Sequence, residues 1–279
     1  RQQQQPAHTA SADGTDESLQ ALSVQGTQGS QKPRRSVVRT RTAPAAKDIP
    51  ELEGLDLRFS NMGAGDWRVR HSALTELVDI MLKYPVEVAP KLVSIFDHLT
   101  LRLADGNSKV LLLALTSLVK LVPVLKNSLE VVLNTLIPSL SQQIGSSNAS
   151  VRQTTLAVLD AIIQHVDNTS LVQYFANVIA FGNPRAKAVI VEKTAAIVSQ
   201  VYRQKPQLIL KHVLPRAVRL VEDQNGEMRT ACTALLQSLH ACLGDKLEAT
   251  EMTQEQRRRV VAAVGGNAQY HRSPAKGRS

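Results

Sequence analysis

Five stretches of the sequence resemble one another at long, nearly regular intervals. Each has a short polar segment followed by a run in which apolar residues recur with helical spacing. The stretches superimpose on Val69, Val110, Val151, Ala186 and Met228, and the intervals are 41, 41, 35 and 42 residues. This period is typical of two-helix HEAT units, which bury their apolar faces by stacking on one another. We therefore predict an all-α HEAT-repeat α-solenoid with five two-helix repeats and a partial sixth.

A short polar residue precedes the second helix of every repeat. These residues are Asp66, Asn107, Asn148, Asn183 and Asn225. Such side chains cap a helix by accepting a hydrogen bond from one of its first backbone N–H groups. The capped helix should carry the apolar stripe, for example Val110, Leu113, Ala114, Ser117, Leu118 and Leu121. We expect Pro123, Pro138 and Pro215 to end or kink helices.

The composition suits packed helices, because 43% of the residues are apolar and only 3% are aromatic. Cys232 and Cys242 lie ten residues apart in one predicted helix, about 15 Å along its axis, which is too far for a disulfide. We expect two reduced, buried thiols of an intracellular protein. No run of about 18 apolar residues is evident, so we expect no membrane span. The first residue is Arg, which favours a fragment without a signal peptide.

The charge of +9 is concentrated at the ends of the chain. Residues 1–47 are rich in Gln, Ser and Thr and are expected to form a disordered basic and polar linker. Its run KPRRSVVRTR at 32–41 is best explained as a solvated linker, with attachment to a polyanion or nuclear import as alternatives. Residues 48–244 contain the repeats. Residues 245–279 should form a partial sixth-repeat helix at 253–264 and a basic disordered tail.

Motifs of catalysis are absent from the sequence. It contains no phosphate-binding glycine motif, no H-E-x-x-H and no C-x-x-C. His98, His165 and His240 fall at helical positions without a second ligand at i+4. We therefore predict that the protein is not an enzyme and has no cofactor, metal or catalytic residues.

The turns inside two-helix repeats lie along one edge of a solenoid, so we expect their side chains to form one binding surface. The candidates are Trp67, Arg68, Arg70, Asn107, Lys109, Asn148, Arg152, Arg185, Lys187 and Arg229. A cation at a helix start opposes the helix dipole, and five such placements favour an acidic partner. The alternative is that polar turns are simply solvated. Trp67, the only Trp, is interpreted as an exposed interface anchor, with a staple between repeats as the alternative.

Several motifs resemble the TOG domains of microtubule regulators. They are DWRVRHSALTEL, RLADGNSKVLLLAL, QHVDN, NPRAKAVIVEKTAAIVSQVYRQKP and MRTACTALLQSL. Over about residues 50–244 the chain looks most like the C-terminal TOG domain of the crescerin family, the TOG-array regulators of axonemal microtubules.

The resemblance implies a paddle-like solenoid whose intra-repeat turns bind αβ-tubulin and regulate microtubule dynamics. It implies that Trp67 and Arg68 meet β-tubulin, with Asn107 and Lys109 extending that contact. Arg152, Lys187 and Arg229 would sit on the later turns, which lie toward α-tubulin. It also implies further TOG domains in a longer parent chain, and a location in the cytoplasm, at the cytoskeleton and in the cilium or axoneme.

Two other functions are consistent with the sequence. A generic HEAT-repeat scaffold would bind a protein or peptide through its helical face and would not bind tubulin. Nonspecific nucleic-acid binding through the tails is weaker, because the basic tracts lack the interleaved aromatic residues of a stacking platform. We therefore expect no specific nucleic-acid partner and no membrane partner.

Overall fold

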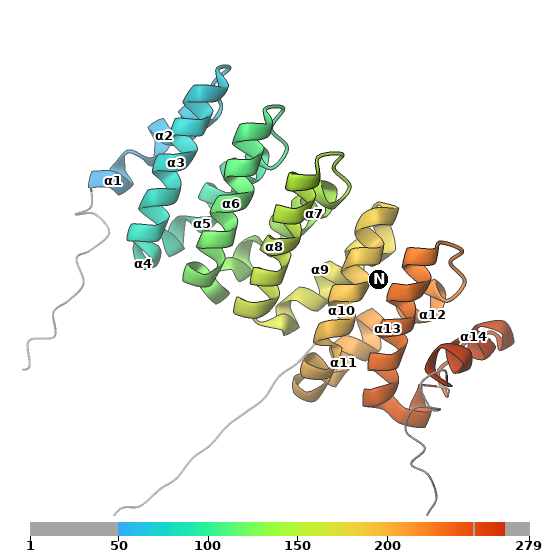
Figure 1. The fold of residues 1–279 in the computed structure, drawn as a ribbon. Coiled ribbons are helices and arrows are strands. Elements are labelled where there is room, and N and C mark those ends of the chain that lie inside the picture. The colour runs from blue at the N-terminus through green and yellow to red at the C-terminus, as the bar shows by residue number, and fades with distance from the viewer. Residues whose placement is uncertain (1–49, 248, 266–279) are drawn as a thin grey trace, which may run out of the picture. The chain divides into compact units, whose positions relative to one another are not determined.

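The computed structural model describes residues 50–247 and 249–265, which form helices and turns without a strand. The longer helices stand in pairs side by side, in two layers (Figure 1). One layer contains α3 (Trp67–Lys83), α6 (Ser108–Leu125), α8 (Ala149–His165), α10 (Pro184–Gln204) and α13 (Gly226–Leu243). The other contains α2 (Leu55–Met62), α5 (Leu92–Arg102), α7 (Leu133–Ile144), α9 (Asn168–Phe181) and α12 (Leu214–Leu220). The predicted all-α HEAT solenoid is confirmed.

Single helices lie at both ends of the five pairs. α1 (Pro50–Glu53) comes before α2, and α14 (Gln254–Gly265) packs against α13 and α12. α14 corresponds to the helix expected at 253–264, and it is the one long helix described after the fifth pair. The linker expected at 1–47 and the tail after residue 265 lie outside the described residues.

The predicted caps start the second helix of every pair. Their side-chain oxygens accept backbone hydrogen bonds of 2.9 Å from Arg68 to Asp66, 2.9 Å from Lys109 to Asn107, 2.9 Å from Ser150 to Asn148, 2.8 Å from Ala186 to Asn183 and 3.1 Å from Met228 to Asn225. All five caps are confirmed. Each satisfies one N–H group that the helix itself cannot pair.

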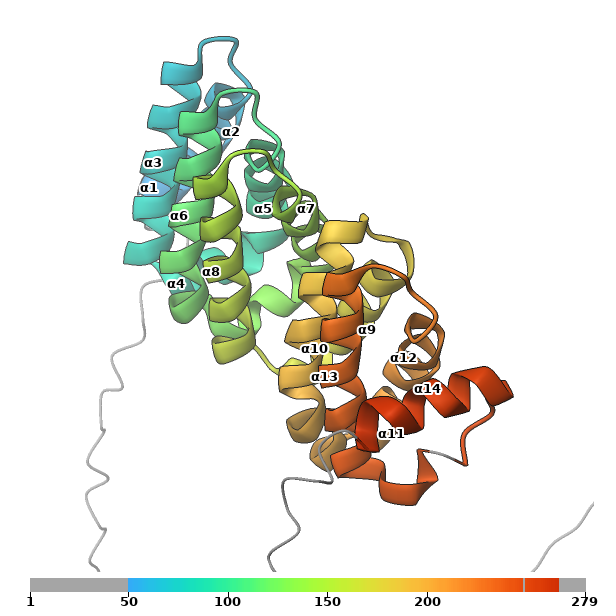
Figure 2. The same ribbon diagram turned by 45° about the vertical axis from the view of Figure 1, so that its right-hand side comes forward.

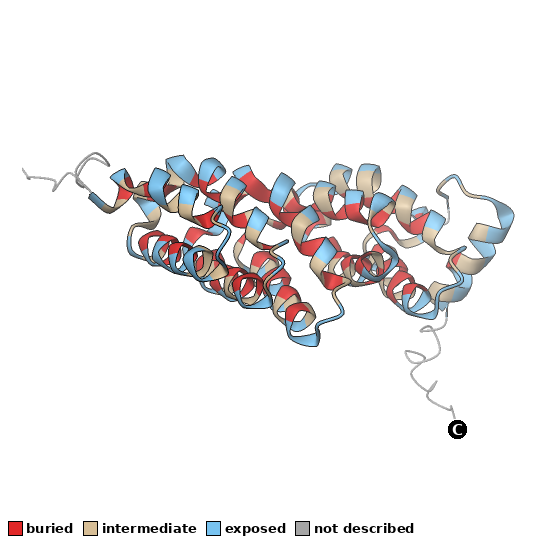
Figure 3. Ribbon diagram, turned by 90° about the horizontal axis from the view of Figure 1, so that it is seen from above, coloured by how far each residue is buried: buried red, intermediate tan, exposed pale blue. Residues whose placement is uncertain are grey.

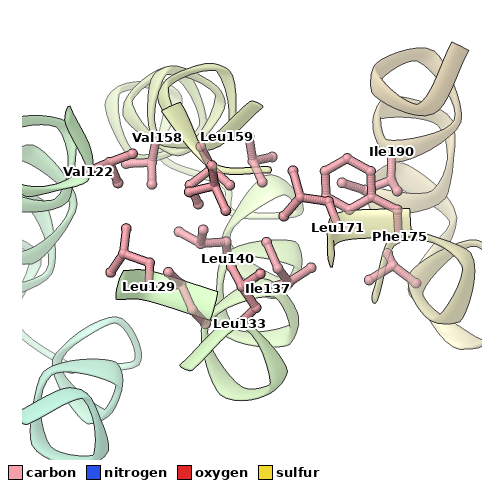
Figure 4. Close-up of a cluster of buried hydrophobic side chains, with 14 of the residues drawn as sticks. Val122, Leu129, Leu133, Ile137, Leu140, Val158, Leu159, Leu171, Phe175 and Ile190 are labelled. Carbon is pink, nitrogen blue, oxygen red and sulfur yellow. The ribbon is translucent and has the colours of Figure 1, made fainter. Parts of the chain in front are cut away.

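A mainly aliphatic core fills the space between the two layers (Figure 3). Leu and Val dominate it, and the largest fully buried side chains include two phenylalanines, Phe96 and Phe175. Figure 4 shows its middle section, where Leu140 of α7, Leu159 of α8, Leu171 of α9 and Ile190 of α10 lie in one cluster. The core is therefore continuous from pair to pair, as stacked repeats require.

The short 35-residue interval reflects a missing connector. Short helices join the other pairs: α4 (Pro85–Val88) with η2 (Ala89–Lys91), η3 (Lys126–Val132), and α11 (Pro206–Leu208) with η4 (Ile209–Val213). Only Val166 and Asp167 join α8 to α9. Without the connector, α9 packs against α7, and the α10–α13 half is offset from the α3–α6–α8 row (Figure 2).

The three internal prolines behave differently. Pro123 lies two residues before the end of α6, and Pro215 follows the π-helical turn η4, so both stand at helix boundaries. Pro138 lies inside α7, which continues to Ile144. Of the two expectations, that Pro138 ends or kinks its helix, the first is therefore wrong, because the missing N–H group is tolerated within a helix held by tertiary packing, and the kink stays a prediction.

One apolar stretch bears on the expectation of no membrane span. Among the described residues, the stretch Ser108–Ile144 is long and apolar enough by length and composition. It is two helices, because α6 ends at Leu125 and η3 separates it from α7. α6 packs on α3 and α8, and α7 packs on α8 and α9. Its apolar side chains therefore belong to the core of the solenoid.

Lys126, which follows α6, has a backbone conformation that favours glycine. Its φ and ψ are 49° and −129°, close to the 55° and −139° of Gly244 after α13. A residue with a Cβ atom pays of order 1–3 kcal/mol in such a region.

We expect Lys126→Gly to raise the free energy of unfolding by about 1 kcal/mol, because it removes this strain. Denaturant unfolding followed by circular dichroism measures the change. Gly244→Ala is the matched control and should lower stability, since open space surrounds its Cβ position and only the backbone opposes the change. A destabilised Lys126→Gly protein would contradict the prediction.

Candidate functional site

The five intra-repeat turns lie along one edge of the described structure, the upper edge in Figure 1. We call this surface the turn edge; it consists of residues 63–66, 103–107, 145–148, 182–183 and 221–225 with the first turn of the helix after each. Each turn ends in a helix cap, so the same local geometry recurs at each step. The sequence superposition therefore identified equivalent positions correctly.

Trp67 organises the first end of the turn edge. Its indole is half-buried against the core, and His71 meets it edge-on with ring centroids 6.3 Å apart. The charged groups of Arg68 and Lys109 each lie 5.0 Å from the ring centroid. Such cation–π contacts orient both the ring and the cations. We call Trp67, Arg68 and Lys109 the Trp67 cluster. This cluster joins the first turn to the second.

Trp67 is thus both an anchor candidate and a staple. Its buried part packs on the core, as the staple interpretation requires, and its remaining surface stands beside the Arg68 side chain, which is 74% exposed. The side-chain oxygen of Asn107 caps α6 and accepts a hydrogen bond from the backbone of Lys109. Asn107 therefore places Lys109 next to the indole.

Three of the predicted cations hold their own turns together. Arg70 Nη1 donates to the backbone oxygens of Ala64 and Gly65 at 2.8 and 2.9 Å. Arg152 Nη1 donates in the same way to Ser146 and Ser147 at 2.7 and 2.9 Å. Both arginines stand four residues after the cap, so the two turns share one hydrogen-bond pattern.

Lys187 occupies the same position after its cap, and its Nζ donates to the backbone oxygen of Ala180 at 3.3 Å. These hydrogen bonds give a structural reason for the cations near the helix starts. The sequence pattern alone had favoured an acidic partner as the reason. Arg185 and Arg229 are exposed, and Arg185 also reaches the backbone oxygen of Gly145 in the preceding turn at 3.4 Å. Arg68, Lys109, Arg185 and Arg229 are therefore the outward-facing cations of the predicted set.

Asp105 links the first two turns and was not singled out in the sequence. Arg70 binds both of its carboxylate oxygens at 2.8 Å, and Arg102 donates to Oδ2 at 2.9 Å. The Asp105 side chain is only 2% exposed. Arg102 precedes Asp105 by three residues, but Arg70 lies 35 residues away. The stacking of the first two repeats therefore brings Arg70 and Asp105 together, which local sequence spacing does not indicate.

The pKa of Asp105 is lower than that of an ordinary aspartate. Burial raises this pKa, but the hydrogen bonds from Arg70 and the backbone of Asn107, with the charges of Arg70 and Arg102, outweigh the burial. Arg70 in turn has a raised pKa, chiefly because of its hydrogen bonds to Asp105. This centre therefore stays ionised at neutral pH.

The turn edge carries side chains suited to binding. No group of three or more His, Cys, Asp or Glu side chains among them could hold a metal ion. Both cysteines are free, as expected, but only Cys232 is buried, and Cys242 is half-buried. Burial raises the pKa of Cys232 to about 12, so its thiol is not a ready nucleophile. The turn edge presents cations, an aromatic ring and amide groups.

Comparison with known proteins identifies the family of this chain. The profile described as XMAP215/Dis1/CLASP, TOG domain matches residues 63–260, which begin at the first turn and end within α14. The chain belongs to this TOG-domain family. The resemblance to TOG domains stated from the sequence is therefore confirmed.

Two curated relatives point to the crescerin group within the TOG family. The human TOG array regulator of axonemal microtubules protein 1 is 32% identical over 218 residues, which cover 75% of this chain and 13% of the relative. The mouse protein of that name is 32% identical over 225 residues, covering 77% of this chain and 12% of the relative. This TOG-domain chain thus spans about an eighth of these relatives. Its likeness to their C-terminal TOG domain in particular stays a prediction.

Solved TOG domains share the fold. A TOG domain of C. elegans Zyg9 superimposes with a TM-score of 0.61 at 15% identity, covering 76% of this chain and 82% of that one. A structure of crescerin, which uses a TOG domain array to regulate microtubules in the primary cilium, gives a TM-score of 0.54 at 16% identity, covering 79% and 91%. At these identities the likeness concerns the fold.

We expect Asp105→Ala to lower the free energy of unfolding by about 3 kcal/mol, because it leaves the buried parts of Arg70 and Arg102 without their counter-charge. Urea unfolding measures the loss. Glu255→Ala is the matched control, since its pair with Arg259 is exposed and should contribute little to stability. Equal effects of the two substitutions would show that Asp105 is not a structural centre.

The lowered pKa of Asp105 also predicts a pH dependence. A depressed folded-state pKa contributes stability that is present above the unfolded value of about 3.9 and is lost as the pH falls through the folded value. The difference in stability between the wild-type protein and Asp105→Asn should therefore be constant from about pH 7 to 5 and shrink below about pH 4. Urea titrations across this range provide the measurement, and a gap that persists in acid would contradict the prediction.

Proposed function

We propose that the turn edge binds αβ-tubulin and that the chain is a tubulin-binding module of a microtubule regulator. The observation that carries this proposal is the Trp67 cluster, an aromatic ring flanked by two cations at the start of an edge of repeated turns. Support comes from the TOG family match and from the names of the relatives, which are regulators of axonemal microtubules. One solved relative with this fold concerns TOG–tubulin binding specificity.

The Trp67 cluster would act as the anchor of the interface. The indole supplies a rigid apolar contact. Lys109 and Arg68, whose exposed side chain also lies 3.8 Å from Asp66, would meet acidic side chains of the partner. By the resemblance, Trp67 and Arg68 meet β-tubulin and Lys109, placed by Asn107, extends that contact. The capped, half-buried environment fixes these groups before binding, which lowers the ordering cost of association.

The later turns would continue the contact toward α-tubulin. Arg185 and Arg229 are the exposed cations there. Arg70, Arg152 and Lys187 would contribute mainly by holding their turns in shape through backbone hydrogen bonds, and so position the outward residues. The proposed action is binding by geometry, with no catalytic step.

A longer parent chain would determine the effect on microtubules. The described domain corresponds to a small part of its curated relatives, which are named as TOG arrays. We infer that further TOG domains accompany it and that it works at the cytoskeleton of the cilium or axoneme. The module would raise the local concentration of tubulin at microtubule ends.

Trp67→Glu, alone or combined with Arg68→Ala, is expected to abolish co-elution of the chain with αβ-tubulin on gel filtration. The substitution places a negative charge where an acidic partner should dock and removes the aromatic anchor. Far-ultraviolet circular dichroism should stay helical, because the core packs beneath the turn edge.

Lys91→Ala is the matched control, since Lys91 is an exposed cation of η2, which joins α3 to α5 at the ends opposite their turns (Figure 1). It should bind as the wild-type chain does. Binding that survives the double substitution at Trp67 and Arg68 would exclude the turn edge. It would favour a generic HEAT scaffold, for which substitutions on the exposed helix flanks would matter instead.

A further inference from the structure

Phe181 is exposed directly before the fourth turn of the turn edge. It is the last residue of α9, and it is 86% exposed, more than any other large apolar side chain among the described residues. Gly182 follows and donates its N–H to the backbone oxygen of Val178 at 2.7 Å. A Cβ atom at Gly182 would lie 2.5 Å from that oxygen, so only glycine allows this tight exit from α9. The backbone therefore holds Phe181 at the end of its helix.

A cavity of about 490 Å³ opens beside Phe181, between the end of α9, the start of α10 and α12. Ile179 and Leu220 add to its apolar lining. Its charged groups are three cations, Lys187, Arg216 and Arg219, and one acid, Asp223. We call this cavity with Phe181 the Phe181 site. Its charge favours an acidic ligand, and its volume is that of an ordinary binding pocket.

Two cations of α12, Arg216 and Arg219, line the cavity. Arg216 Nη1 donates to the backbone oxygen of His212 at 2.7 Å, which fixes the side chain, while its Nε is buried and has no hydrogen-bond partner in the described structure. Arg219 is exposed and forms no ion pair with a described residue. Both guanidinium groups line the cavity, so a carboxylate that enters it would meet two cations held on neighbouring turns of α12.

We propose that the Phe181 site is a second anchor of the turn edge, which binds an acidic segment of the tubulin dimer: a carboxylate meets Arg216 and Arg219, and an apolar side chain packs on Phe181. This inference rests on the proposed function. The site lies on the same edge as the Trp67 cluster, three turns further along (Figure 1). Two separated aromatic anchors fix the register of an elongated partner better than one.

The test measures the Kd of the full 279-residue chain for fluorescently labelled αβ-tubulin by anisotropy. Phe181→Ala and Arg219→Glu should each weaken binding by roughly tenfold or more, as removal of an interface anchor does. The effect of Arg219→Glu should diminish at high salt, because exposed charges are screened.

Val86→Ala is the matched control for Phe181. Val86 is 76% exposed in α4, at the edge away from the turns, and its loss should leave the Kd unchanged (Figure 1). The thermal midpoint of each variant should equal that of the wild-type chain, since each altered side chain is exposed.

The outcomes separate this inference from the proposed function. If the wild-type chain binds tubulin and Trp67→Glu abolishes binding, but Phe181→Ala and Arg219→Glu bind normally, the Phe181 site is overturned and the proposed function stands. If the wild-type chain does not bind tubulin, both fail. Weakening by Phe181→Ala and Arg219→Glu, with an unchanged Val86→Ala, supports the second anchor.

Discussion

Every part of this structure depends on stacking, because no helix pair can bury its apolar face alone. The core is built mainly from Leu, Val and Ile, and it runs without interruption through the layers of paired helices. Where a connector is missing between α8 and α9, the stack shifts but the core continues through Leu171 and Phe175. The offset therefore changes the direction of the turn edge without dividing the hydrophobic core.

The turn edge follows from the same repetition. Each second helix starts at a capped turn, and each cap satisfies the same orphan N–H groups. In the first and third turns an arginine closes the loop by donating to two backbone oxygens. In the fourth turn a lysine donates to one backbone oxygen. Residues that organise the edge thus stand within a few positions of residues that face outward.

Much of the fold and part of the site could be predicted from the sequence. The caps, the period and the separation of Cys232 from Cys242 depend on local spacing along a helix, and all are confirmed. The inward role of Arg70 could not be predicted in this way, because its partner Asp105 is 35 residues distant. The exposure of Val69 also depends on tertiary structure. Its equivalents in the other repeats are buried, whereas Val69 is 39% exposed because α3 begins the row of helices.

The sequence by itself determined that the chain is a helical repeat protein with capped turns, because helix caps and apolar periodicity act over a few residues. The tertiary structure decided which turn residues face outward. It placed Lys109 against Trp67, turned Arg70 toward Asp105, and brought α12 beside Phe181. The physical reason is that stacking joins side chains from different repeats, and the geometry of that stacking depends on connectors and packing that the period alone does not specify.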